Sequence, residues 1–450
     1  MSRTKSPKLD RIVVKGLFAK YDYDIGGTDT ASMAPLAILY GDNGCGKTTI
    51  LRLVFHLLAH ERTQGHRGFV SRVNFREVSL KFSDGSTVWA RRTGHDTTGE
   101  FVMGLDRSGL CLQQAVFRPN SEGLVVLSSP DEEAHSDALL AEIQNMGHSL
   151  YMLSDDRKVE TSEVSDGVPT VFRRRPRDTR RLMGEHLRRP SASEREPDPE
   201  TLAVALLESS IQNASDWIRS HVMFGSSRGE YDVNVIYAKI AEQVARPKSR
   251  PKSPMRERIL ALESRIKKVA SRNAALEEWG FTSGLDGSRL LNTLSQAEGR
   301  NGSVLADVLE PYLDSVEARH KALDSIEERT RTLVRALNTY LVDKTAKFNL
   351  RGGLGVMAND GQELLPAQFS SGERHLLLLF CNVMTALDGA SIFIIDEPEI
   401  SLNVRWQRRL VGSLLECARG TQVQFVMASH SLEILTKHNN RVVRLRDTQS

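Results

Sequence analysis

Apolar residues in the first hundred positions change their spacing several times, and each spacing predicts a different element. Residues 10–23, rich in Ile, Val, Leu and aromatic side chains, predict an opening strand, and residues 36–40 predict a short buried one. Residues 48–60 carry apolar side chains at helical spacing. Alternating positions in 78–90 around the turn Asp84-Gly85 predict an antiparallel hairpin.

The middle of the chain is predicted to be helical. Residues 202–222 and 233–244 have helical spacing. Residues 259–276 repeat apolar side chains in steps of three and four, with Asn273 as the one polar position, and a second such seam covers 305–337. Because glycines lie between the two seams, we expect an antiparallel hairpin arm. An ordinary helical subdomain is the alternative.

Strands and helices alternate again near the C-terminus. Residues 376–387 and 406–418 predict helices, whereas 392–395 and 423–428 are almost wholly apolar runs that predict buried strands. This alternation is typical of a parallel sheet with helices on both faces. The predicted fold class is therefore α/β, with a mostly parallel sheet, an antiparallel subdomain and an inserted helical or short coiled-coil arm.

Composition narrows the class of protein. At 450 residues the chain exceeds what one hydrophobic core usually holds, so we expect two lobes. No stretch approaches the roughly 20 apolar residues that span a bilayer, and residues 1–8 are polar and basic rather than a signal peptide. We therefore expect a cytoplasmic protein without a membrane segment, whose four cysteines are free, buried thiols.

Positive charge is concentrated in two segments, although the net charge is only +3. Eight arginines lie between Arg173 and Arg189, and a second basic run covers 246–256. Such runs can contact phosphate backbones without sequence preference, which predicts weak nucleic-acid binding. The prolines and serines around them favour the other interpretation, a solvated insert.

A glycine-rich loop lies between the predicted strand 36–40 and the helix that follows. The segment Gly41-Asp42-Asn43-Gly44-Cys45-Gly46-Lys47-Thr48 fits the phosphate-loop pattern, in which backbone N–H groups surround phosphate oxygens at a helix N-terminus. Lys47 would contact the β- and γ-phosphates, and the Thr48 hydroxyl would ligate Mg²⁺. The predicted nucleotide-binding residues here are Asn43, Gly44, Cys45, Gly46, Lys47, Thr48 and Thr49.

Two adjacent carboxylates end the apolar run 392–395. Asp396 and Glu397 are followed by Pro398, so both acids would lie at the carboxyl edge of the sheet, where ligands of such sheets bind. Asp396 is suited to hold Mg²⁺, and Glu397 to polarise the attacking water. A helix N-cap would explain one carboxylate after a strand, but it does not explain two in tandem.

Two further motifs complete the set. Ser370 and Gly372 lie just before an apolar helix, so Ser370 can cap it and leave N–H groups free for an anion. His430 follows the last buried run directly. Each feature alone is common in proteins, whereas their order (phosphate loop, capped helix, acidic strand end, strand-end histidine) is specific.

These residues resemble the motif set of ABC-type ATPases. In chain order the matches are Lys47 in the Walker A loop, residues 369–373 for the signature LSGGQ, Asp396 and Glu397 in Walker B, residues 401–403 for the D-loop, and His430 for the switch histidine. The resemblance implies ATP and Mg²⁺ as cofactors, with Lys47, Glu397 and His430 as catalytic residues. It also implies that two heads sandwich the nucleotides and that Ser370 and Gly372 act across this dimer.

Three positions depart from the family pattern. Ser371 replaces the first signature glycine, Asn403 replaces the usual D-loop aspartate, and the glutamine loop has only Gln113 and Gln114 as candidates. The wide separation of the half-sites is similar to the SMC, RecF and OLD group. By this resemblance residues 1–165 and 349–450 form the two halves of the head, 166–200 a basic insert and 201–348 the helical arm.

The string that begins at Asp396 and runs to Gln407 is similar to OLD-like ATPases of bacterial anti-phage systems. Because the chain ends soon after His430, where OLD nucleases continue into a TOPRIM domain, the expected effector is a separate polypeptide, as in Septu, PARIS or retron systems. The predicted function is an ATP-hydrolysing, self-associating homodimer or higher oligomer that regulates this partner. A DNA-repair ATPase of the RecF or SMC type and an ATP-binding sensor scaffold with little turnover are the alternatives.

Overall fold

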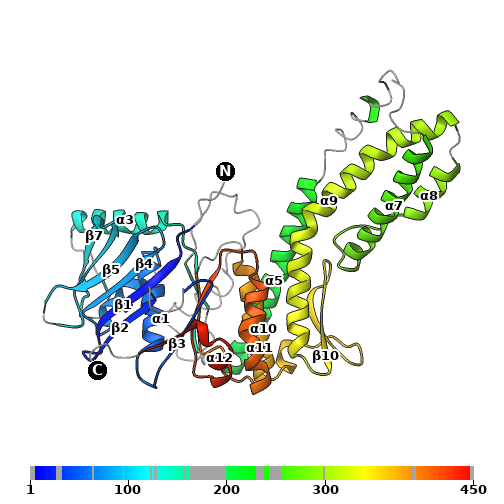
Figure 1. The fold of residues 1–450 in the computed structure, drawn as a ribbon. Coiled ribbons are helices and arrows are strands. Elements are labelled where there is room, and N and C mark those ends of the chain that lie inside the picture. The colour runs from blue at the N-terminus through cyan, green and yellow to red at the C-terminus, as the bar shows by residue number, and fades with distance from the viewer. Residues whose placement is uncertain are drawn as a thin grey trace, which may run out of the picture. The chain divides into compact units, whose positions relative to one another are not determined.

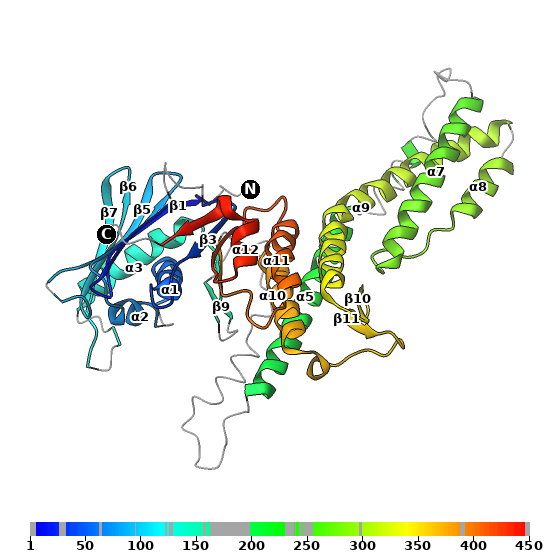
Figure 2. The same cartoon turned by 60° about the horizontal axis from the view of Figure 1, so that its bottom comes forward.

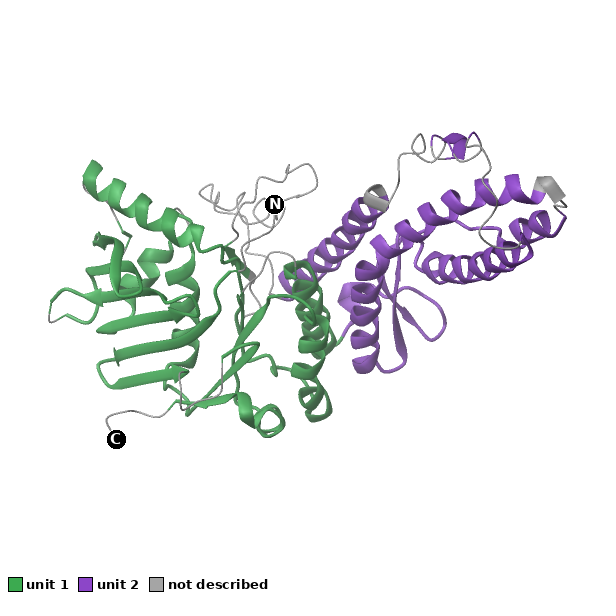
Figure 3. Ribbon diagram, turned by 45° about the horizontal axis from the view of Figure 1, so that its top comes forward, with its two compact units in different colours: residues 1–171, 370–450 green, residues 172–369 purple. Residues whose placement is uncertain are grey.

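The computed structural model describes residues 6–26, 33–62, 65–94, 96–121, 124–125, 129–155, 159–162, 199–229, 238, 240–242, 245, 255–296, 299–387 and 392–445. The chain folds into two compact units (Figure 3). Residues 1–171 and 370–450 form the first unit, and residues 172–369 form the second. The arginine cluster 173–189, most of the basic run 246–256 and most of the predicted helix 233–244 lie outside the described residues.

A six-stranded, mostly parallel sheet carries the carboxyl-terminal motifs. Its order is β14 (Val442–Arg444), β3 (Leu36–Tyr40), β13 (Gln424–Ala428), β12 (Ile392–Asp396), β8 (Leu150–Leu153) and β9 (Val159–Ser162), of which only the last pairs antiparallel. Every residue of β12 and β13 is buried, as expected for central parallel strands. The carboxyl ends of β3, β12 and β13 therefore meet at one edge.

The second sheet of this unit is antiparallel. Its order is β2 (Tyr21–Gly26), β1 (Leu9–Leu17), β4 (Glu77–Phe82), β5 (Ser86–Arg92), β6 (Phe101–Arg107) and β7 (Leu110–Phe117). The predicted hairpin at Asp84-Gly85 is confirmed by the pairing of β4 with β5. The single opening strand predicted for 10–23 is wrong, because Phe18 and Ala19 take positive φ and reverse the chain between β1 and β2. Nothing in these two residue types indicates a left-handed turn.

Helix α1 (Lys47–Leu58) packs between the two sheets and contacts β5 of one and β12 and β13 of the other (Figure 2). Phe55, on α1, is fully buried in a core that also takes Ile12 from the antiparallel sheet and Ile394 from the parallel one. Such burial fixes the start of α1, and with it the loop 41–46, against the carboxyl edge of β12. The remaining helices of this unit are α2 (His66–Arg72), α3 (Pro130–Asn145), α10 (Ser371–Ala386), α11 (Val404–Cys417) and α12 (Leu432–Lys437).

The cysteines do not all follow expectation. All four are free, and Cys45, Cys381 and Cys417 are buried. Cys111 is exposed. It lies near the start of β7, where the residues of this edge strand of the antiparallel sheet are exposed. The expectation of a buried thiol was therefore wrong at this one position.

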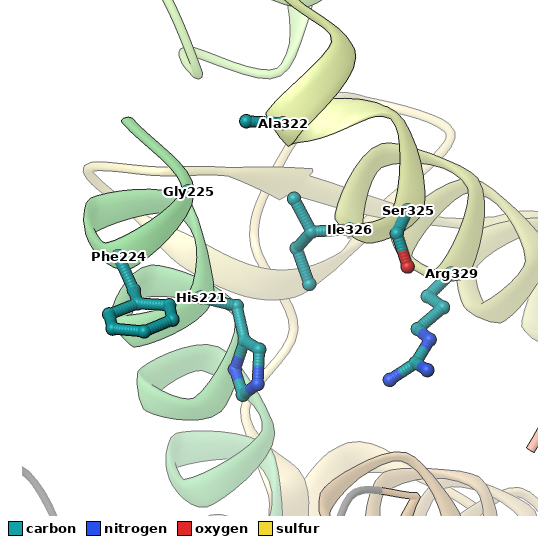
Figure 4. A pocket seen from close by; sticks show the side chains of 7 residues that line it. All are labelled: His221, Phe224, Gly225, Ala322, Ser325, Ile326 and Arg329. Carbon is teal, nitrogen blue, oxygen red and sulfur yellow. The ribbon is translucent and has the colours of Figure 1, made fainter. Parts of the chain in front are cut away.

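The second unit is built on long helices. It contains α5 (Pro199–Gly229), α7 (Met255–Glu278), α8 (Gly287–Gln296), α9 (Gly299–Tyr340) and the hairpin of β10 (Lys344–Asn349) and β11 (Gly353–Ala358). Helices α5 and α9 run antiparallel, since Trp217 lies near Arg329 and Gly225 near Ala322. A hollow of about 240 Å³ opens between them, with His221 and Phe224 on one side and Ser325 and Arg329 on the other (Figure 4).

The two heptad seams belong to parallel helices, so the predicted antiparallel hairpin is wrong. Arg258, Arg265 and Arg272 on α7 each bind carboxylates on α9, and the pairs Arg258–Glu310, Arg265–Glu317 and Arg272–Asp324 all keep a sequence separation of 52. A constant separation requires the same chain direction. Helix α8, which the sequence did not predict, packs against α7 and lies between the seams in the chain (Figure 1).

The polar position in the first seam has its own partners. Asn273 is 5% exposed, and its Nδ2 donates to the Ser283 carbonyl at 2.8 Å. Its Oδ1 lies 3.1 Å from His320 Nε2 on α9. A hydrogen-bonded polar layer of this kind specifies helix register in coiled coils. The Asn273–His320 contact therefore fixes the register of α7 against α9.

Candidate nucleotide-binding site

The phosphate-loop segment closes tightly after β3. Gly44 and Gly46 take φ of 80° and 91°, the left-handed region that favours glycine. A Cβ at Gly46 would lie 2.6 Å from Cδ2 of Leu17, so no larger residue fits where α1 begins. The Tyr23 hydroxyl donates to the Cys45 carbonyl at 2.9 Å and holds the loop to the antiparallel sheet.

The ammonium group of Lys47 lies inside this loop. Its Nζ donates to the carbonyls of Gly41 at 2.9 Å and Asp42 at 3.1 Å, and the residue is only 6% exposed. The first turn of α1 contains no acidic residue that would neutralise this charge. Positive charge and the helix N-terminus therefore coincide, which is the electrostatic requirement for binding a phosphate.

Asp396 is the last residue of β12 and is 2% exposed. Burial raises the pKa of its carboxyl group to about 6, the nearby Thr48 hydroxyl lowers that pKa, and the charges of Asp155 and Glu397 raise it further. Neither carboxylate oxygen makes a hydrogen bond of ordinary geometry to a residue in the described ranges. The structure thus brings together Thr48 and Asp396, the two residues that the sequence proposes as metal ligands.

This pair fits a magnesium ion. Two buried carboxylate oxygens that have no hydrogen-bond partner among the described residues lie beside a hydroxyl oxygen, and oxygen donors are the ligands that Mg²⁺ prefers. Asp396 and Thr48 would hold the ion there. When bound, it supplies positive charge to the β- and γ-phosphates of a nucleotide.

Glu397 and His430 face each other at the same sheet edge. Glu397 has a φ of 46°, unusual for a residue with a side chain, and its N–H donates to the Ala428 carbonyl at 3.0 Å. Its Oε1 lies 3.9 Å from His430 Nε2, and the two side chains are 36% and 34% exposed. Unlike Asp396, both groups are open to solvent and so can meet a water molecule.

Ser370 caps α10 through a reciprocal pair with Glu373. The Ser370 N–H donates to Glu373 Oε2 at 2.8 Å, and the Glu373 N–H donates to Ser370 Oγ at 3.3 Å. A Cβ at Gly372 would lie 2.6 Å from the Ser401 carbonyl, so glycine is required where α10 meets the D-loop-like segment. Within the described part of the chain, neither Ser370 nor Gly372 hydrogen-bonds to the phosphate loop.

The structure also places the two glutamine-loop candidates and adds two residues that the sequence did not indicate. Gln113 and Gln114 lie on β7, in the antiparallel sheet, away from the carboxyl edge of β12. Asp155 follows β8, the neighbour of β12, and its charge acts on Asp396. Glu399 binds the segment that contains His430. The short run 150–153 could have indicated Asp155, which follows it. The sequence carries no signal for Glu399 other than its place after Pro398.

Asp396→Asn is expected to stabilise the nucleotide-free protein. The pKa of Asp396 is near 6 in the folded protein and 3.8 in the unfolded chain, so the folded protein binds the proton more tightly. When the carboxylate is ionised, this difference destabilises the fold by about 3 kcal/mol. The penalty is present above about pH 6 and disappears below about pH 4. Urea denaturation should therefore show a more stable variant at pH 7.5, with the difference shrinking toward pH 4.

Asp137→Asn is the matched control for this prediction, because Asp137 is exposed and pairs only with Arg62 among described residues. Saturating MgATP should reverse the order of stability, since the variant loses a metal ligand. Equal stability of wild type and Asp396→Asn at pH 7.5 would contradict the prediction.

Comparisons with known proteins agree with this geometry. A family model described as "AAA domain, putative AbiEii toxin, Type IV TA system" matches residues 238–436, less than half of the chain but including Ser370, Asp396 and His430. The chain is 32% identical over 97 residues to the lipoprotein-releasing system ATP-binding protein LolD of Cereibacter sphaeroides, covering 22% of this chain and 41% of that one. It is 25% identical over 154 residues to the retron Ec83 probable ATPase of Escherichia coli, covering 31% and 28%.

The motif order, the sheet edge and these relatives agree. The chain has the motif order of ABC-type P-loop ATPases and is similar to such ATPases over part of its length. Its helical arm lies between the two half-sites in the sequence. The Smc head domain of Pyrococcus furiosus aligns over 98% of this chain and 94% of that chain, at 12% identity and a TM-score of 0.40.

The chain spans less than half the length of the curated relatives that it matches. Among its described helices, none is both long enough and apolar enough to cross a membrane.

Proposed function

We propose that this ATPase binds MgATP at residues 43–49 and hydrolyses it with Glu397 as the residue that polarises the attacking water. The observation that carries the proposal is the division between two adjacent carboxylates. Asp396 is buried beside Thr48, whereas Glu397 is partly exposed and faces His430 at 3.9 Å. A buried carboxylate suits metal binding, and an accessible one suits proton transfer to or from water.

Each remaining residue has a role in this proposal. Lys47 exchanges its two carbonyl partners in the loop for the β- and γ-phosphate oxygens. The N–H groups of the glycine-rich loop bind the same phosphates. Glu397 accepts the proton of the attacking water, and the imidazole of His430 donates a hydrogen bond to the γ-phosphate.

We further propose that two copies of the chain form each complete site. The helix N-terminus at Ser370 is a further anion site, yet Ser370 and Gly372 have their described contacts with Glu373, Ser401 and Trp406 rather than with the phosphate loop. A second copy could present Ser370 to a nucleotide bound at Lys47. This head-to-head arrangement is what the resemblance to ABC-type ATPases implies.

The biological role that we propose is regulation of a separate effector protein in anti-phage defence. Similarity to the retron Ec83 and retron Vc95 probable ATPases supports this role, as does the resemblance of the string from Asp396 to Gln407 to OLD-like ATPases. ATP-driven association of two heads would then change the surface that the effector contacts.

Phosphate release by the purified chain tests the enzymatic part, and light scattering with and without ATP tests the dimer. Magnesium-dependent release is expected together with a doubling of mass in ATP. Purification of the native complex tests the effector. A chain that fails to bind ATP in calorimetry would contradict the whole proposal.

A further inference from the structure

One oxygen of Glu399 holds the segment that contains His430. Oε1 accepts hydrogen bonds from the Ser429 hydroxyl at 2.8 Å, the His430 N–H at 2.6 Å and the Ser431 N–H at 3.0 Å. Three donors on one carboxylate oxygen are an uncommon concentration, and hydrogen bonds to an ionised acceptor are about twice as strong as neutral ones. Glu399 therefore holds three consecutive residues to the segment that follows β12.

A second side chain extends this connection. The Ser431 hydroxyl donates to Gln407 Oε1 at 2.7 Å, and Gln407 Nε2 donates to the Leu402 carbonyl at 2.8 Å. Glu399 and Gln407 thus tie residues 429–431 to two points of the segment between β12 and α11. Ser429 is fully buried and Ser431 is 8% exposed, so these polar groups have little access to water.

The backbone of His430 is held, while its side chain is not. The imidazole is 34% exposed, and its only described polar neighbour is the Glu397 carboxylate at 3.9 Å. Where the imidazole lies is consequently set by the backbone of 429–431. Because Glu397 and Glu399 belong to the same short segment, the contacts of Glu399 also set the separation between Glu397 and His430.

We propose that Glu399 is a positioning residue for hydrolysis, which acts by fixing His430 beside Glu397 and the γ-phosphate. This inference rests on the proposed function of His430. In the described structure the Glu399 side chain makes no hydrogen bond or ion pair with the phosphate loop, Lys47 or Thr48, and its hydrogen bonds are with residues 429–431. Its loss should therefore affect turnover and leave ATP affinity nearly unchanged.

The test is a double-mutant cycle of Glu399→Ala and His430→Ala. Glu399→Ala is expected to lower kcat by about 10- to 100-fold with less than about a threefold change in KM. In the His430→Ala background, the same change should lower kcat by less than about threefold, because its effect passes through the imidazole. Glu399→Gln keeps an acceptor oxygen and should retain most of the activity.

Glu433→Gln is the matched control, since Glu433 lies two residues beyond Ser431 and pairs with exposed Arg408 rather than with the loop. If the losses in kcat of Glu399→Ala and His430→Ala multiply fully in the double variant, the proposal is overturned and Glu399 has a purely structural role. If Glu399→Ala does not fold, Glu399→Asp replaces it, because the shorter side chain keeps the charge but loses the reach to three donors.

Hydrogen exchange separates this inference from the proposed function. Peptides that cover 428–432 should exchange at least about tenfold faster in Glu399→Ala, while peptides from α1 should not change. This result would support the anchoring even if the wild-type chain proved inactive, an outcome that would count against the proposed function instead. Unchanged exchange at 428–432 would overturn the anchoring whatever the ATPase rate.

Discussion

Glu397→Gln is expected to bind ATP as tightly as the wild type and to hydrolyse it at least ~100-fold more slowly. The amide keeps the shape of the side chain but cannot accept a proton from water. The backbone at Glu397 should not change, because its positive φ and its N–H bond to the Ala428 carbonyl do not depend on the carboxylate. Steady-state phosphate release and a nucleotide-binding assay together measure this difference.

Lys47→Ala gives the contrasting result. It removes the cation at the start of α1, so nucleotide affinity should fall along with turnover. Glu433→Gln, which changes an exposed carboxylate in the same unit, should leave both quantities unchanged. Normal turnover in Glu397→Gln would remove this residue from its proposed role, whereas loss of ATP binding would indicate a structural defect.

Ser370→Arg and Lys47→Ala chains are each expected to be inactive alone and to regain activity when mixed. In a mixed dimer, one composite site combines Lys47 from the first chain with Ser370 from the second, and the other site lacks both. Random association makes half of the dimers mixed with one working site each, so about a quarter of wild-type activity should return. Phosphate release at a fixed total concentration measures the recovery.

Arginine at position 370 also removes a helix cap, which costs about 1 kcal/mol. The thermal stability of Ser370→Arg is therefore measured alongside the assay. Ser370→Gly is measured in the same way, because glycine as a cap costs only a few tenths of a kcal/mol and adds no bulk. Wild-type turnover by Ser370→Arg alone would mean that each site is complete within one monomer. A mixture that stays inactive although both chains fold would argue against sharing of sites.

The sequence alone indicated the residues of the proposed nucleotide site. The loop at Gly44 and Gly46 needs left-handed backbone angles that glycine provides, so its composition signals its shape. The strand that ends at Asp396 is buried on both faces, and such burial is visible as an uninterrupted apolar run. These signals are local, since each arises within about ten residues of chain.

Tertiary structure decided the direction of the arm helices and the position of Glu399. A heptad seam shows which face of a helix is buried, but it does not show whether its partner is parallel. Only pairs such as Arg265–Glu317 settle that α7 and α9 are parallel. Likewise, Glu399 binds Ser429 and two backbone N–H groups 30 or more residues away, and backbone donors leave no trace in a sequence. Contacts between distant segments depend on how the sheet orders β12 and β13, which no local pattern encodes.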